Sequence, residues 1–154
     1  MANLLWLQGG ACSGNTMSFL NAEEPSACDL VTDFGINVLW HPSLGVELGD
    51  NLQKLLRDCV SGAIPLDIFV FEGTVVTAPN GTGEWNRFAG KAMQQWVSDL
   101  SKAAQFVVAI GDCATWGGIQ PPRRTRANRA ACSSSSAPKA ATWATTSCPS
   151  RACR

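Results

Sequence analysis

The chain is poor in charged residues and has no long apolar run. Charged residues make up 16% of the 154 residues, the formal net charge is zero, and 45% of the residues are hydrophobic. This composition excludes a wholly disordered chain, a collagen and a highly charged nucleic-acid binder. No apolar run reaches the roughly 18 residues that a membrane-spanning helix needs. The start of the chain lacks a basic segment followed by a long apolar core, so we expect no cleavable signal.

The end of the chain lacks acidic and large aliphatic residues. Residues 121–154 contain no Asp, Glu, Val, Ile, Leu, Met or Phe, so their net charge is +7, whereas residues 1–120 carry −7. Such a segment buries too little apolar area to offset a backbone ordering cost of about 1–2 kcal/mol per residue. We therefore predict one domain over residues 1–119 and a disordered basic tail over residues 120–154. A basic arm that binds nucleic acid is the alternative, but we expect no nucleic-acid partner.

The first 119 residues alternate between predicted strands and helices. Short apolar runs that end near glycine or proline predict strands at residues 4–7, 35–40, 66–71 and 105–110. Apolar residues at helical spacing predict helices at residues 16–21, 48–60 and 85–104. This alternation favours right-handed crossovers and a parallel sheet, so the predicted fold class is α/β. Ligands of open α/β sheets bind at the loops that follow the strands.

Cysteine and histidine are the candidate metal ligands. Seven cysteines, an odd number without a secretion signal, favour reduced thiols or metal ligands over a disulfide framework. Cys12 follows the first predicted strand and Cys113 the fourth, and both lie in glycine-containing loops. Two such thiolates suit an iron–sulfur cluster, and two ordinary thiols are the alternative. Cys59 lies on the apolar side of a predicted helix and is expected in the core. His41, the only histidine, is expected to be structural.

The loop Gly9–Thr16 permits a second functional interpretation. Its spacing, G-x-x-x-x-G-N-T, is close to the phosphate-binding pattern G-x-x-x-x-G-K-[ST], and it lies between a predicted strand and a predicted helix. Asn15 stands where that pattern needs lysine, so the loop lacks the main cationic partner of a triphosphate. A flavodoxin-like nucleotide- or phosphate-binding module using this loop is the alternative function.

Three segments of the chain resemble the small subunit of uptake-type [NiFe] hydrogenases: LLWLQGGACSGNTMSFLNAEEP, FEGTVV and VVAIGDCATWGGI. The resemblance runs along residues 2–119. It implies a flavodoxin-like three-layer domain that holds a proximal [4Fe–4S] cluster. It also implies a large subunit with a nickel–iron centre as partner, and a redox acceptor that receives the electrons of H2 oxidation. The implied location is the cytoplasm, with attachment to the cytoplasmic side of a membrane only through partners.

The resemblance also assigns roles to residues around the cluster. Cys12 and Cys113 match two cluster ligands, and Glu72 matches a carboxylate with a proton-transfer or structural role. Many family members have a further cysteine where this chain, like the uptake branch, has Asn15. Asn15 then coordinates weakly, donates to sulfide or leaves room for another ligand. The implied cluster environment consists of Gly10, Gly14, Asn15, Glu72 and Gly111.

The resemblance ends after Ile119. The family continues with a Gly-Cys-Pro loop that carries the last proximal ligand, and with a second domain that holds the medial and distal clusters. Reading the tail one nucleotide earlier, with permissible codons, returns a string similar to the family's continuation. A single lost base therefore explains both the break and the composition of the tail. We expect a truncated, frameshifted product that is inactive by itself, with medial and distal clusters only in an intact chain.

Overall fold

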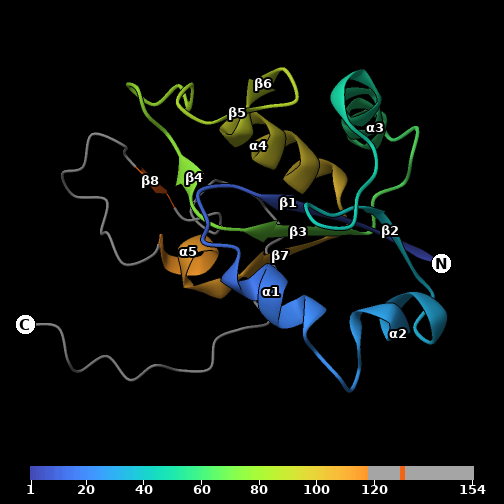
Figure 1. The fold of residues 1–154 in the computed structure, drawn as a ribbon. Coiled ribbons are helices and arrows are strands. Elements are labelled where there is room, and N and C mark those ends of the chain that lie inside the picture. The colour runs from blue at the N-terminus through green and yellow to red at the C-terminus, as the bar shows by residue number, and fades with distance from the viewer. Residues whose placement is uncertain (118–128, 131–154) are drawn as a thin grey trace, which may run out of the picture.

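The computed structural model describes residues 1–117 and the backbone of residues 129–130. Its main sheet contains four strands: β1 (Ala2–Gln8), β2 (Ile36–Trp40), β3 (Ile68–Glu72) and β7 (Phe106–Ile110). All neighbouring pairs are parallel and the order is β2-β1-β3-β7 (Figure 1). The predicted α/β class is confirmed. This order is that of flavodoxin-like sheets, in which the strand order reverses between β1 and β3.

Helices cover both faces of this sheet, which gives the domain three layers. Helices α3 (Gly49–Ser61) and α4 (Met93–Ala103) lie on one face, and α1 (Gly14–Leu20) and α2 (Ala27–Thr32) lie on the other (Figure 1). Helix α5 (Gly111–Trp116) continues directly from the end of β7. Among the described residues, no helix is both long enough and apolar enough to cross a membrane.

Alternation along the strands divides the core between the two faces. Leu5, Leu7 and Phe71 are buried under α3 and α4, whereas Leu4 and Trp6 are buried on the face of α1 and α2. Because successive side chains of a strand point to opposite faces, a strand covered on both sides carries apolar residues at every position. This explains the unbroken apolar runs in the sequence.

The prediction of one helix over residues 85–104 is wrong in its first part. Strands β5 (Arg87–Phe88) and β6 (Lys91–Ala92) form an antiparallel hairpin there, and α4 begins only at Met93. The turn of the hairpin holds Ala89 and Gly90 at φ of 44° and 88°, which a right-handed helix does not allow. The hairpin folds back onto the helix, where Phe88 packs against the same core. Residues of the hairpin and of α4 therefore share one apolar face, and their spacing in the sequence resembles that of a single helix.

Two short helices were not expected. Helix α2 begins with a reciprocal cap, in which Ser26 N–H donates to Asp29 and Asp29 N–H donates to the Ser26 hydroxyl, a signal that the sequence S-x-x-D contains. Helix α5 replaces the loop that was predicted after the fourth strand, so Cys113 lies on a helix.

Part of the predicted tail forms a strand. Strand β8 (Arg129–Ala130) pairs antiparallel with β4 (Val75–Val76). The domain boundary after residue 119 and the disorder of residues 120–154 stay predictions. The other residues of the predicted tail lie outside the described residues.

We expect Cys59 to resist alkylation in the native protein. Its thiol is fully buried in α3, and burial, aided by the charge of Asp58, raises its pKa to about 11, so the reactive thiolate is scarce. Iodoacetamide should modify the exposed Cys12 and Cys28 and leave Cys59 unmodified until denaturant is added. Peptide mass spectrometry measures this, and native labelling of Cys59 as fast as that of Cys28 would contradict it.

Candidate functional site

The strand ends that bear the candidate residues lie side by side. In the register of the sheet, Gln8 at the end of β1 pairs with Glu72 at the end of β3, and Glu72 pairs with Ile110 at the end of β7. Each of these residues is followed directly by a glycine. Two loops and the helix α5 therefore leave the sheet at the same level, at the edge where we expected ligands.

Backbone contacts join the two loops. Gly10 N–H donates to the Thr74 carbonyl at 2.9 Å, and Thr74 N–H donates to the Gly10 carbonyl at 3.1 Å. Gly73 has a φ of 94°, and a Cβ added to it would come within 2.6 Å of the Ala11 Cβ. Only glycine lets the two chains approach so closely. Gly10 thus contributes to the site through this pairing.

The carboxylate of Glu72 binds the first turn of α1. Its side chain is 1% exposed. One oxygen accepts the N–H groups of Asn15 and Thr16 at 3.1 and 3.4 Å, and the other accepts the Thr16 hydroxyl at 2.5 Å. A negative group at a helix N-terminus meets free N–H groups and the positive end of the helix dipole. Glu72 therefore fixes where α1 begins relative to β3.

Cys12 lies in the turn between β1 and α1. Ser13, the residue before the helix, has a φ of 63°, and its hydroxyl accepts a hydrogen bond from Gln8 Nε2 at 2.8 Å. The Cys12 side chain is exposed. A Cβ added to Gly14 would lie 3.2 Å from the Cys12 sulfur, so glycine leaves that sulfur room.

Asn15 and Gly111 bring the first turns of α1 and α5 into contact. Gly111 has a φ of 79°, and a Cβ added to it would come within 2.2 Å of Asn15 Nδ2. The Asn15 side chain therefore occupies the space that a larger residue at 111 would need. Cys12 precedes this contact by three residues, and the half-buried Cys113 follows it by two. The two candidate thiols thus lie close to one contact between α1 and α5 along the chain.

The described residues offer an incomplete ligand set for a metal cluster. Within residues 1–117, no group of three or more His, Cys, Asp or Glu side chains is arranged to hold a metal ion. Cys28 is exposed on α2, and Cys59 is enclosed in the core. The described residues accordingly offer two of the four thiolates that a four-iron cluster commonly uses.

The geometry disfavours a phosphate in the Gly9–Thr16 loop. The N–H groups of Asn15 and Thr16, which a phosphate would need, already bind Glu72, as does the Thr16 hydroxyl. A phosphate would have to displace a buried carboxylate of its own charge. The hydrogen bond between Thr16 and Glu72 could not be predicted from the sequence, because the two residues are 56 positions apart and no local pattern joins them.

His41 has the structural surroundings that we expected. It follows β2 and is buried, and its ring packs on Trp6 and Phe19 with centroid separations of 4.8 and 5.8 Å. Its Nδ1 accepts the N–H of Ser43 at 3.1 Å. Burial lowers the pKa of His41, and the negative charge of Glu72 opposes that shift.

Known proteins similar to this chain include one family of oxidoreductase subunits and several hydrogenase small subunits. Residues 12–152 match the family described as NADH ubiquinone oxidoreductase, 20 Kd subunit, a range that includes most of the predicted tail. A 38-residue segment, 25% of this chain, is 92% identical to the cytochrome c3 hydrogenase small chain of Acidithiobacillus ferrooxidans and covers 95% of that sequence. Over 118 residues, 77% of this chain and 36% of the relative, the chain is 30% identical to the periplasmic [NiFe] hydrogenase small subunit 1 of Nitratidesulfovibrio vulgaris.

The fold is also found in a solved hydrogenase. The recombinant [NiFeSe] hydrogenase from Desulfovibrio vulgaris Hildenborough contains a chain that matches 86% of this one with a TM-score of 0.73 and 24% identity. The match covers 47% of that chain. The curated relatives that align with three quarters of this chain are themselves about three times as long as the matched part.

We expect Glu72→Gln to destabilise the domain by about 1–3 kcal/mol, because two N–H groups and a buried hydroxyl lose a charged acceptor. Urea denaturation measures the change in the free energy of unfolding. The exposed Glu23 is the matched control, and Glu23→Gln should change the free energy by less than about 0.5 kcal/mol. Equal effects of the two substitutions would contradict the role assigned to Glu72.

We expect His41 to make stability fall in acid. Its pKa in the folded chain lies below the unfolded value of 6.5, so unfolding takes up a proton between those two values. This contribution is complete above pH 6.5 and is lost as the pH falls toward the folded-state pKa. His41→Gln should therefore lose less stability than the wild type over that interval, as measured by urea denaturation. Parallel pH profiles for the two proteins would show that His41 does not titrate differently on unfolding.

Proposed function

Since this chain belongs to the family of the 20 Kd subunit of NADH ubiquinone oxidoreductase, we propose that it is the cluster-bearing part of an electron-transfer subunit. The relatives that support this proposal are small subunits of hydrogenases. The subunit would serve a [NiFe] hydrogenase of the uptake type, which oxidises H2. It would receive electrons from the nickel–iron centre of a large subunit and pass them to a redox acceptor.

The observation that carries the proposal is the arrangement of Cys12 and Cys113. The two thiols flank the contact between Asn15 and Gly111, at the edge of the sheet where the strand order reverses nearby. A four-iron cluster, when bound there, supplies one-electron redox chemistry. Cys12 and Cys113 would bind it, and Gly14 would leave space beside the Cys12 sulfur. Two further ligands would have to come from outside the described residues or from other molecules.

In this proposal Glu72 positions a ligand. Its bonds to Asn15 and Thr16 hold the first turn of α1, and the turn with Cys12 immediately precedes that helix. The side chain of Asn15 packs on Gly111, so it acts as a spacer between the turn that carries Cys12 and the helix α5 that carries Cys113. These contacts favour a structural role for Glu72 over that of a mobile proton carrier, because all its bonds serve the helix terminus.

Exposed apolar side chains on the helix that follows Cys12 and on the helix that contains Cys113 support a protein partner at this edge. Met17 on α1 is 61% exposed, and Trp116 on α5 is 72% exposed. Large apolar side chains of this kind are typical of surfaces that another protein covers. By analogy with the hydrogenase small subunits that this chain resembles, this partner would be a large subunit that carries the nickel–iron centre.

The test is anaerobic reconstitution of the full chain with iron and sulfide. We expect substoichiometric, labile iron–sulfur absorbance, because only two ligands lie in the described part of the chain. Cys12→Ser and Cys113→Ser should each remove this absorbance. Cys28→Ser is the matched control, since that thiol is also exposed but lies on α2, and it should leave the absorbance unchanged.

Two results would contradict the proposal. Retention of the absorbance in both Cys12→Ser and Cys113→Ser would show that these thiols are not ligands. Saturable binding of ATP or flavin by the unreconstituted chain, lost on substitution of Thr16, would instead favour the phosphate-binding alternative.

A further inference from the structure

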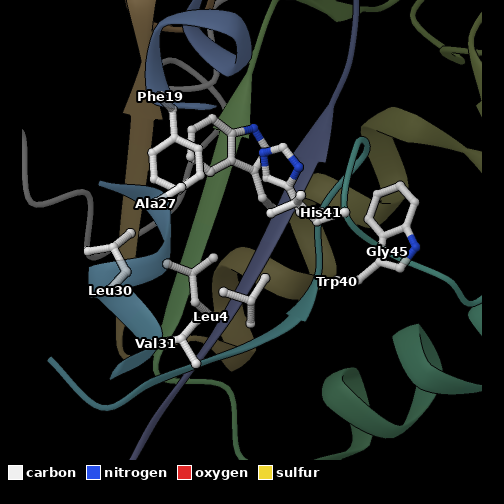
Figure 2. Close-up of a pocket in the computed structure, with 11 residues that line it drawn as sticks. Leu4, Phe19, Ala27, Leu30, Val31, Trp40, His41 and Gly45 are labelled. Carbon is white, nitrogen blue, oxygen red and sulfur yellow. The ribbon is translucent and has the colours of Figure 1, made fainter. Parts of the chain in front are cut away.

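A second candidate site lies on the face of the sheet under α1 and α2, separate from the cysteine-bearing loops. A pocket of about 140 Å³ lies between the strands β1 and β2 and the helices α1 and α2, and the turn after β2 closes one end. Figure 2 shows Phe19, Ala27 and Val31 along the helical wall and His41 on the opposite side. Val31 and Leu44, 47% and 51% exposed, form its rim.

The lining is apolar except for two buried nitrogen atoms. Trp6 and His41 are 4% and 1% exposed, and both line the pocket. Within the described part of the chain, Trp6 Nε1 and His41 Nε2 have no hydrogen-bond partner. Buried polar atoms are normally bonded, so two orphans in one pocket require an explanation. The indole of Trp40, which also lines the pocket, differs because its N–H donates to the Glu47 carbonyl at 3.2 Å.

Both orphan atoms are donors. The indole nitrogen of Trp6 can only donate. His41 Nδ1 accepts the N–H of Ser43, so in the neutral imidazole the proton lies on Nε2. The two rings contact each other edge to face, with centroids 4.8 Å apart. The two donors therefore belong to rings in direct contact, beside the same pocket.

We infer that this pocket binds a small uncharged carbonyl compound, whose oxygen accepts from Trp6 and His41 and whose ring or chain fills the apolar part. The lining offers a cation no carboxylate, and the two unpartnered nitrogen atoms in it are donors, which favour an acceptor oxygen. It also disfavours an anion, which would lose its hydration without a charged partner. An apolar cavity of about 150 Å³ holds a benzene molecule, so a ligand of about that size fits this pocket.

Two isosteric probes separate hydrogen bonding from simple filling of the cavity. Cyclohexanone carries the acceptor, and methylenecyclohexane replaces its oxygen with a CH2 group of similar size. We expect the full chain to bind the ketone roughly tenfold more tightly, because the hydrocarbon leaves two buried donors unpaired. Titration followed by 1H–15N spectra measures both affinities. The side-chain N–H signals of Trp6 and His41 should shift with the ketone.

Two matched pairs of variants locate the site. Trp6→Phe removes an orphan donor and should reduce the preference for the ketone, whereas Trp40→Phe removes an N–H bonded elsewhere and should preserve it. Ala27→Leu fills the pocket and should abolish binding of both probes. Cys28→Leu places the same side chain on the exposed side of α2 and should not. Circular dichroism confirms that each variant is folded.

The inference does not depend on iron–sulfur chemistry, since the probes are tested on the chain without a cluster. Equal affinity for the two probes would reduce the site to an apolar cavity and overturn the assignment of the donors. Absence of binding by either probe, with the Trp6 and His41 signals unmoved, would show that the cavity holds only water. Equal loss of binding in Ala27→Leu and Cys28→Leu would place the probes elsewhere.

Discussion

The buried carboxylate of Glu72 joins the end of β3 to the first turn of α1, and the candidate site is arranged around that bond. A carboxylate removed from water is tolerated where donors replace its lost hydration, and Asn15 and Thr16 provide those donors. The bond occupies the helix terminus that a phosphate would otherwise use. It also determines the position of α1, and with it the turn that carries Cys12. This one interaction thus disfavours phosphate binding at the start of α1 and holds the helix that follows Cys12.

Close approach of the loops is the second requirement. The strand ends at Gln8, Glu72 and Ile110 are in register, and a glycine follows each of them, so three chains leave the sheet side by side. At Gly73 and Gly111 a side chain would collide with Ala11 and Asn15 respectively. The absence of a side chain at Gly111 is what allows Asn15 to contact it, and Cys12 and Cys113 lie within three residues of that contact along the chain.

Helix α1 belongs to both sites. Its first turn is held by Glu72 at the edge of the sheet, and its Phe19 forms part of the wall of the apolar pocket. Burial lowers the pKa of His41 in that pocket, and the negative charge of Glu72 opposes this shift. The two sites are nevertheless chemically distinct. One offers thiols and backbone at an exposed edge, and the other offers two neutral donors in an apolar cavity.

The local sequence by itself determined the strands of the sheet, most of the two long helices and the positions of Cys12 and Cys113 after the first and the fourth strand, because apolar runs and their glycine endings are local properties. It could not determine the hairpin before α4, since the apolar spacing of residues 85–92 suits a helix as well as a hairpin that folds onto the same core. Only the tertiary structure decided which loops touch. Three contacts depend on the order and register of the strands: the hydrogen bond between Thr16 and Glu72, the packing of Asn15 on Gly111, and the contact between the rings of Trp6 and His41. Contacts between residues so far apart in the chain follow from how the sheet is assembled, which no local spacing encodes.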